Sequence, residues 1–348
     1  MAERPSAITA SYNGVSPEIR GPLAFAGTGA AILGRTTLGT RAWLGHFAAI
    51  RADGHYIEIG DDFVLGDHGT IHIAHDVYPT HIGHRVSAGQ GAVIHACTVG
   101  DDCVIDREAI ILDGSIIGAG AVIAAGSVVF PRTELDGGWL YAGSPAKPIA
   151  PVSAAELRAH HSRIRDSLSN RPQDTAGPPS KTSLDCFVAP SARVTGDIRA
   201  EEGVGIWYGC RLDAGAHHIE IGAGTNIQDN SSVTCERSEV VIGPDVTVGH
   251  NVTMTDCRID SGSLIGIGSR ISAGTIVESD VLVAAGAHTE PGQRLTSGSI
   301  WAGRPARPIR PMETKQRKMM MGTLPVYRAY AEQFRNLPHR QLDRVGED

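Results

Sequence analysis

The stretch VGDDCVIDREAIILDGSIIGAGAVI, residues 99–123, carries an aliphatic side chain at every sixth position. A helix would repeat its apolar residues at intervals of three and four, and a half-buried strand would repeat them at intervals of two. A strict interval of six fits neither element. It is typical of a solenoid of short strands, in which three hexads make one triangular coil of about 18 residues. Each aliphatic side chain then points into the axis of the solenoid.

The same interval extends toward the N-terminus and returns in the second half of the chain. In the first half it includes Leu38, Leu44, Ile50, Ile59, Leu65, Ile71, Ile82, Ala88 and Ile94. In the second half it includes Ile221, Ile227, Val233, Ile242, Val248, Met254, Ile259, Ile265, Ile271, Val277 and Val283. A β-sandwich, with strands every 8–12 residues, would not hold this phase over successive steps. We therefore predict an all-β protein with two tandem solenoid domains of hexapeptide repeats.

Composition changes divide the chain into four segments. Residues 1–21 form an N-terminal tail, and residues 22–168 form the first solenoid domain with a C-terminal helix. Residues 169–183, rich in Pro and Ser, are a linker by composition. Residues 184–348 form the second solenoid domain with its own C-terminal helix.

Each solenoid is followed by a similar exit sequence and a predicted helix. In the first domain Ser153 and Glu156 form a capping box at the start of the helix. In the second domain we expect the helix to begin at about Pro325, since proline is favoured in the first turn. Both helices carry an apolar stripe and are expected to pack against their solenoids.

Charge and cysteine content exclude several classes of partner. The chain has 31 Lys+Arg against 38 Asp+Glu, a net charge of −7, so we expect no nucleic-acid partner. It shows no leader-like N-terminus and no apolar run long enough to span a membrane, so we expect a soluble, cytoplasmic protein with no membrane partner. The six cysteines contain no C-x-x-C pair, so we expect reduced thiols and no cysteine zinc site.

His72 and His95 follow core positions and are separated by 23 residues. The step from Ile71 to Ile82 is 11 instead of six, so five residues loop out and 18 remain, which is one coil. The two histidines should therefore lie on one face, one coil apart, at about 4.8 Å of backbone spacing. That spacing allows them to bind one metal ion together.

The second half has a different set of polar side chains. Thr234 and Thr255 replace the two histidines, whereas Asn226, Gln228 and His250 share another face, one hexad away. The first half has Val64, Gly66 and Gln90 at the equivalents of this second set. Each half therefore keeps one set of polar side chains and lacks the other. The two sets can meet only where a first-half solenoid, which is a triangular prism, contacts a second-half prism.

Such a junction would hold three imidazoles, from His72, His95 and His250, with Asn226 and Gln228 to orient a bound water. Three neutral nitrogens and an open fourth position are the catalytic zinc arrangement, which supplies hydroxide at neutral pH. Iron or cobalt would also accept these ligands.

We interpret the other histidines as surface residues, among them His46, His55, His160 and His161. The looped-out segment beside His72 carries further titratable side chains, and a loop there could hold a proton shuttle. These side chains are His75, Asp76, Tyr78, His81 and His84.

Both halves resemble the γ-class carbonic anhydrase family, through GTIHI, PTHIG and GAVIHACTVG in the first half and IEIGAGTNIQDNSSV and VTVGH in the second. The resemblance implies left-handed β-helices that assemble as trimers. It implies that His72 and His95 bind zinc together with His250 of a neighbouring prism, near Asn226 and Gln228. It also assigns the family's Arg-x-Asp motif to Arg51 and Asp53, near the substrate. Ungapped alignment places Asp213 and Gly215 at these positions in the second half.

The leading hypothesis is a zinc-dependent lyase in which a metal hydroxide attacks carbon dioxide or another small carbonyl compound. In this hypothesis Arg51 helps to hold bicarbonate, and the protein is a homo-oligomer. One alternative is a hexapeptide acyltransferase that uses acyl-CoA, and another is a non-catalytic assembly module with degenerate metal sites.

Overall fold

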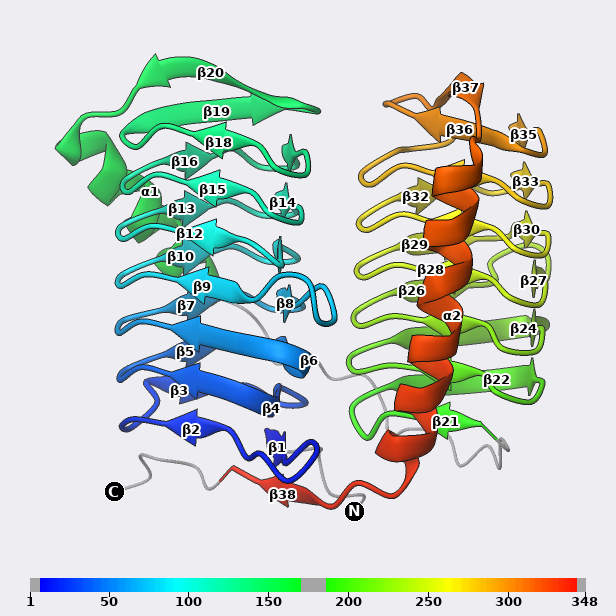
Figure 1. Cartoon of the computed structure of the whole chain (residues 1–348), viewed down its shortest axis with the longest axis horizontal. Helices are drawn as coiled ribbons and strands as arrows, with labels where there is room; N and C mark the ends of the chain where they lie inside the picture. The colour runs from blue at the N-terminus through cyan, green and yellow to red at the C-terminus, as the bar shows by residue number, and fades with distance from the viewer. Residues whose placement is uncertain (1–6, 170–185, 343–348) are drawn as a thin grey trace. The chain divides into compact units, whose positions relative to one another are not determined.

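The computed structural model describes residues 7–169 and 186–342. Within these ranges the chain forms two compact units, one of residues 7–169 with 337–342 and the other of residues 186–336. Figure 1 shows each unit as a stack of short parallel strands with one long helix along a face. The prediction of two tandem left-handed β-helix domains is confirmed.

The first unit has three sheet faces that meet at tight corners. The long strand β6 bends at a corner and contributes to two of them, and it pairs with β8 at its start and with β9 at its end. The third face runs from β3 to β20. The strands are β1 (Ile8–Ala10), β2 (Glu18–Ile19), β3 (Phe25–Ala26), β4 (Ala31–Leu38), β5 (Trp43–Leu44), β6 (Ala49–Ile59), β7 (Val64–Leu65), β8 (Thr70–His72), β9 (Thr80–Ile82), β10 (Ser87–Ala88), β11 (Val93–His95), β12 (Thr98–Val99), β13 (Val104–Ile105), β14 (Ile110–Ile111), β15 (Ile116–Ile117), β16 (Val122–Ile123), β17 (Val128–Val129), β18 (Glu134–Leu135), β19 (Trp139–Gly143) and β20 (Ala146–Pro151).

The second unit repeats this plan, with β24 as the long strand that turns the corner. Its strands are β21 (Phe187–Val188), β22 (Arg193–Ala200), β23 (Gly205–Ile206), β24 (Arg211–Ile221), β25 (Asn226–Ile227), β26 (Ser232–Thr234), β27 (Val240–Ile242), β28 (Thr247–Val248), β29 (Thr253–Thr255), β30 (Arg258–Ile259), β31 (Leu264–Ile265), β32 (Arg270–Ile271), β33 (Ile276–Val277), β34 (Leu282–Val283), β35 (Arg294–Leu295), β36 (Ser299–Ala302) and β37 (Arg307–Pro311). The short strand β38 (His339–Gln341) closes the series in the first unit.

The side chains of the six-residue repeat form the core of each solenoid. All of the hexad positions named above are buried, and none is more than 4% exposed. Small residues at the corners allow consecutive coils to approach closely. A Cβ added at Gly118 would lie 2.3 Å from the backbone nitrogen of Gly137, so only glycine fits there.

The two helices lie on equivalent faces of their solenoids. Helix α1 (Ala154–Ser169) begins at the predicted capping box, in which the Ser153 N–H donates to Glu156 at 2.8 Å. It packs against β10 and β13, and α2 (Thr314–Arg335) packs against β21, β23, β25 and β28. The expected start of the second helix at Pro325 was wrong, because Pro325 lies inside α2. The Met-rich first half of α2 favours helix, and its Met320 is buried.

Short strands lie near both ends of the described chain. The predicted N-terminal tail contains β1 and β2, which pair with β4, and Ala7 and Ile19 pack on the core of the first coil. The strand β38 follows α2 in the chain but pairs antiparallel with β1, in the first unit. The predicted linker lies outside the described residues apart from Ser169. Among the described residues no helix has the length and apolar character needed to cross a membrane.

Candidate metal centre

In the first unit, His72 ends strand β8 and His95 ends β11, one coil further along. The two residues are paired in the register of these parallel strands, as the interval of 23 residues predicted. The Nδ1 of His72 lies 3.2 Å from the Nε2 of His95. Two nitrogens bound tetrahedrally to zinc, at bonds of about 2.0–2.1 Å, lie about 3.3 Å apart. The two histidines therefore fit two neighbouring ligand positions of one metal ion.

A carboxylate contacts the opposite ring nitrogen of each histidine. The Nε2 of His72 lies 3.0 Å from Asp53 Oδ1, and the Nδ1 of His95 lies 2.6 Å from Asp113 Oδ1. A carboxylate accepts a hydrogen bond, so it favours the tautomer that carries the proton on the nitrogen it contacts. Each of the two nitrogens that face one another then carries a lone pair. Two lone pairs at this distance repel unless a cation, either a proton or a metal ion, lies between them.

Arg51 and Asp53 lie together on β6, the strand next to β8. The guanidinium of Arg51 donates to Asp53 Oδ2, and Asp53 uses its other oxygen to contact His72. In the register of the sheet Arg51 is paired with His72. Four predicted site residues, Arg51, Asp53, His72 and His95, are thus joined by direct contacts within the first unit.

The second unit has a hydroxyl pair where the first has its histidines. Thr234 and Thr255 are paired in register on β26 and β29, and their hydroxyls are 3.0 Å apart. Asp213 is paired with Thr234, as Arg51 is paired with His72, so the register supports the ungapped alignment of Asp213 with Arg51. Neutral threonine hydroxyls are poor zinc ligands.

Asn226 and Gln228 form a hydrogen-bonded pair on another face of the second unit. The Nε2 of Gln228 donates to Asn226 Oδ1 at 3.2 Å. The Nδ2 of Asn226 in turn donates to the Thr247 hydroxyl at 3.1 Å, and Thr247 is its register partner on β28. The three side chains therefore form one directed chain of hydrogen bonds.

His250 lies on the coil after Gln228, where its ring contacts Asp229. The Nδ1 of His250 is 3.1 Å from Asp229 Oδ2, and Asp229 Oδ1 accepts a hydrogen bond from the Tyr208 N–H at 3.1 Å. Asp229 thus lies beside Nδ1 of His250 at ion-pair distance, whereas Asp113 is hydrogen-bonded to Nδ1 of His95. A small rotation of either side chain would give the carboxylate–histidine hydrogen bond that usually supports a metal ligand.

Sequence reasoning missed Asp113 and Asp229, although a signal was present for both. Asp229 follows Gln228 directly, and the spacing of Gln228 and His250 by one coil plus one residue places Asp229 beneath His250. Asp113 lies 18 residues after His95, and Ile94 is paired with Ile111, so Asp113 is one residue past the position stacked on His95. Assigning every acidic residue to its position on successive coils, as was done for the histidines, would have identified both aspartates.

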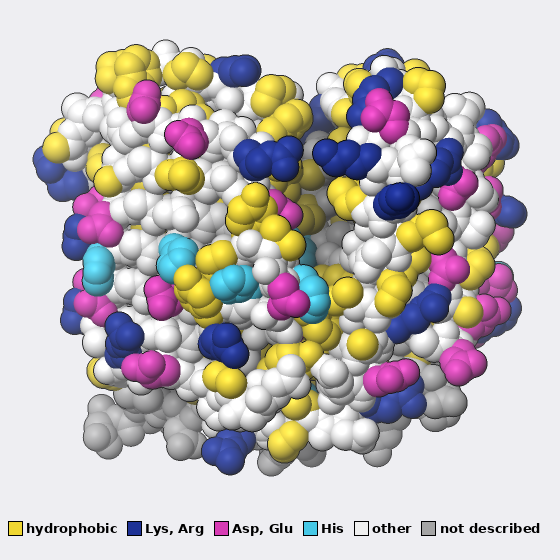
Figure 2. Space-filling model, viewed as in Figure 1, with side chains coloured by type: hydrophobic (Ala, Val, Ile, Leu, Met, Phe, Trp, Pro, Cys, Tyr) yellow, Lys and Arg dark blue, Asp and Glu magenta, His cyan; other side chains and the backbone are white. Residues whose placement is uncertain are grey.

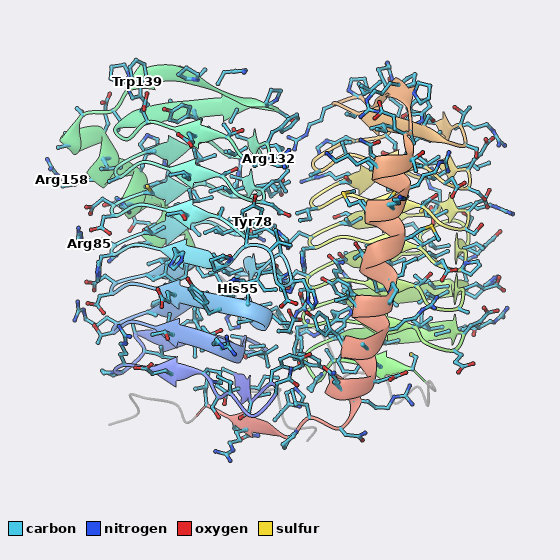
Figure 3. All side chains as sticks on the ribbon, in the orientation of Figure 1. His55, Tyr78, Arg85, Arg132, Trp139 and Arg158 are labelled. Atoms are coloured by element: carbon cyan, nitrogen blue, oxygen red, sulfur yellow. The ribbon has the colours of Figure 1, made fainter. Side chains whose placement is uncertain are left out.

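The looped-out segment, residues 73–79, closes with a bridge between Ala74 and Tyr78. His75 lies 3.4 Å from Asp76, and His81 contacts both Glu58 and the Tyr56 hydroxyl at 3.2 Å. Figure 2 shows several histidine side chains on the viewed face of the first unit. Figure 3 labels Tyr78, which belongs to the looped-out segment. The segment therefore offers exposed titratable groups, and the shuttle residue stays a prediction.

Two expectations about other side chains can be compared with the structure. His161 of α1, expected on the surface, is half-buried where the helix packs on the solenoid. Its Nδ1 lies 2.8 Å from the Ser87 hydroxyl. This expectation was wrong because His161 lies on the side of α1 that faces the solenoid. Burial raises the pKa of the Cys103 thiol to about 11 and that of Cys257 to about 12. Both thiols stay protonated at neutral pH and are poor metal ligands.

Comparison with known proteins places the sequence among hexapeptide-repeat proteins. Residues 96–131 match the family "Bacterial transferase hexapeptide (six repeats)". Gamma carbonic anhydrase 1, mitochondrial, of Arabidopsis thaliana is 39% identical over 139 residues, which cover 38% of this chain and 50% of that protein. Protein YrdA of Escherichia coli (strain K12) is 38% identical over 139 residues, which cover 38% of this chain and 76% of YrdA.

A solved structure is also similar to part of the chain. The hexapeptide transferase family protein from Anaplasma phagocytophilum is 26% identical, with a TM-score of 0.42, and the match covers 47% of this chain and 95% of that one. The chain spans about half the length of the Arabidopsis gamma carbonic anhydrases 1 and 2 that it matches.

Proposed function

Because the chain belongs to the γ-carbonic anhydrase-like hexapeptide-repeat proteins, we propose that it is a zinc-dependent lyase that hydrates carbon dioxide. The zinc ion would be bound by His72 and His95 of a first-half prism and by His250 of a second-half prism. The second-half prism could belong to the same chain or to a neighbouring copy in a three-prism ring. Iron or cobalt could replace zinc, because imidazole suits all three metals.

The observation that carries this proposal is the pair of facing nitrogens in the first unit. The carboxylates of Asp53 and Asp113 contact the far nitrogens of His72 and His95, and the near nitrogens are 3.2 Å apart. A metal ion bound by both near nitrogens would replace their repulsion with two bonds. Two imidazoles do not complete a zinc site, so at least one more protein ligand is required.

The division of residues between the halves supports His250 as that third ligand. The second unit has threonines in place of the histidine pair but has His250 with Asp229 beside it, whereas the first half has Gln90 at the position of His250. Glutamine is a weaker zinc ligand than imidazole. A junction of a first-half prism with a second-half prism therefore brings a complete set of ligands, while a junction of two like prisms does not.

The metal, when bound, would activate a water for attack on carbon dioxide, so that one carbon–oxygen bond forms and the products are bicarbonate and a proton. Asn226 and Gln228 would accept and donate hydrogen bonds that orient the water. The guanidinium of Arg51, held by Asp53, would stabilise the negative charge of bicarbonate. An exposed group of the segment 73–79 would pass the proton to bulk solvent.

Metal content and activity of single variants test the composite site. We expect zinc in the purified wild type, and we expect both His72→Ala and His250→Ala to lose it together with carbon dioxide hydration. His217→Ala, which changes a half-buried histidine of β24 outside both sets, is the matched control and should keep metal and activity. Full zinc occupancy in His250→Ala would exclude a site shared between the halves.

Chelation tests the acyltransferase alternative, and the metal content of the purified protein tests the assembly-module alternative. A hexapeptide acyltransferase would transfer acyl groups from acyl-CoA after the metal has been removed with a chelator. A non-catalytic assembly module would be well folded and free of metal as purified. Either result would contradict the lyase proposal.

A further inference from the structure

Thr247 is the last member of the hydrogen-bonded chain that begins at Gln228. Gln228 donates to Asn226, and Asn226 donates to the Thr247 hydroxyl at 3.1 Å. One N–H of the Gln228 amide is donated to Asn226, and this bond directs the carbonyl Oε1 to the other side, where it can accept from a water O–H. The orientation of this acceptor therefore depends on how Asn226 is held.

The helix side chains next to Thr247 do not compete with Asn226 for its hydroxyl. Thr247 lines a small cavity under α2, to which the helix contributes Met320, Met321 and Leu324. These three side chains have no strong hydrogen-bonding group.

The other polar side chains of this cavity have partners of their own. Asp245 pairs with Arg328, and Asp280 pairs with Arg317 at 2.7 Å. The Ser263 hydroxyl donates to the backbone carbonyl of Glu278 at 3.0 Å. The contact between Asn226 and Thr247 therefore has little competition within the cavity.

The first unit uses the equivalent hydroxyl for another purpose. Val64 and Ser87 are the register partners that correspond to Asn226 and Thr247. Val64 has no polar side-chain atom, and the Ser87 hydroxyl lies 2.8 Å from His161 of α1. A hydroxyl at this position thus ties the helix to the solenoid in the first unit. In the second unit it contacts the amide of a predicted site residue.

We propose that Thr247 is a positioning residue, which fixes the Asn226 amide and, through it, the Gln228 side chain. This inference rests on the proposed function, in which Asn226 and Gln228 orient the reacting water. The terminal torsion of asparagine has a broad energy profile, so packing alone holds the amide weakly. Removing the hydroxyl would leave the buried Asn226 N–H without its acceptor, and the amide would rotate toward another one.

The variant Thr247→Val removes the hydroxyl and keeps the shape of the side chain. We expect the kcat of carbon dioxide hydration to fall about tenfold, the size expected for one lost hydrogen bond. Zinc content should not change, because the described side-chain hydrogen bond of Thr247 is with Asn226 and not with a proposed zinc ligand. Thr247→Ser keeps the hydroxyl and should restore most of the activity. Thr253→Val, at an exposed outward position of β29, is the matched control and should behave as the wild type.

A double-variant cycle separates positioning from a general loss of structure. If Thr247 acts only through Asn226, then Thr247→Val has no further effect on kcat in an Asn226→Ala background. An equal tenfold loss in both backgrounds would overturn the proposal. Wild-type kcat in Thr247→Val itself would also overturn it.

A crystal structure of Thr247→Val supplies a readout that does not depend on activity. We expect the Asn226 amide to be rotated and the Gln228 side chain to be displaced, with the strands β25 and β28 unchanged. Unchanged positions of both amides would refute the positioning role whatever the kinetics show. Rotated amides in a protein that lacks zinc or does not hydrate carbon dioxide would instead refute the proposed function and leave the positioning role standing.

Discussion

The Nδ1 of His95 lies 2.6 Å from Oδ1 of Asp113, one coil further along the first solenoid. This contact fixes the plane of the imidazole and favours the tautomer with the proton on Nδ1. It therefore directs the lone pair of Nε2 toward His72. A carboxylate in this position also strengthens the bond of an imidazole to a metal.

Replacing Asp113 by Asn should weaken metal binding without removing a ligand. We expect the zinc affinity of Asp113→Asn to fall about 10- to 100-fold, the usual effect of losing such a partner. Competition with a chromophoric chelator measures it. Asp106→Asn, at a corner of the same solenoid, is the control. Wild-type affinity in Asp113→Asn would show that His95 needs no orienting carboxylate.

Asp229→Asn tests the same relationship in the second unit. Asp229 contacts His250 at 3.1 Å, so the variant should lower zinc affinity to a similar extent if His250 is a ligand. Because Asp229 also accepts a hydrogen bond from the Tyr208 N–H, thermal unfolding must be followed in parallel. Asp260→Asn removes an exposed ion pair with Arg258 and should leave zinc affinity unchanged. Loss of stability with no loss of affinity would argue against His250 as a ligand.

The solenoid and the histidine pair could be predicted because both follow from one repeat length. Every sixth side chain points into the axis, so counting residues gives the core, and counting coils gives the register of His72 with His95. The same counting predicted the threonine pair of the second unit. Local periodicity is sufficient wherever the structure itself is periodic.

Features that break the repeat could not be predicted in this way. The strand β38 has no hexad pattern, and its position is set by the open edge of β1. The early start of α2 was missed because Pro325 suggested a first turn, whereas burial of Met320 stabilises a longer helix. These outcomes depend on tertiary contacts that a single sequence does not display.

The core position Ile105 and the outward position Ile116 provide a matched test of the repeat. Ile105 is fully buried, whereas Ile116 is 47% exposed. We expect Ile105→Ala to lower the free energy of unfolding by about 2–5 kcal/mol, because it leaves a cavity in the axis. Ile116→Ala should change it by about 0.5 kcal/mol or less. Urea unfolding measures both, and equal losses would contradict the assignment of the axis.

The contact between His161 and Ser87 predicts a pH-dependent attachment of α1. The Nε2 of His161 donates to the carbonyl of Asp102 at 3.1 Å, so its Nδ1, 2.8 Å from the Ser87 hydroxyl, is the acceptor of a neutral ring. Burial lowers the pKa of His161 below its ordinary value of 6.5, and the nearby Arg165 lowers it further, while the Asp102 carbonyl opposes the shift.

Neutral His161 therefore stabilises the folded state above pH 6.5, and this contribution is lost as the pH falls from 6.5 toward the lowered pKa, because only the unfolded chain then takes up the proton. His161→Gln keeps a donor and an acceptor but does not titrate. We expect the urea midpoint of the wild type to fall more steeply between pH 7.5 and pH 5 than that of His161→Gln. His160, whose pKa is also lowered by burial, is present in both proteins and cancels in the comparison. Parallel pH profiles would show that His161 is not held neutral by its contacts with the solenoid.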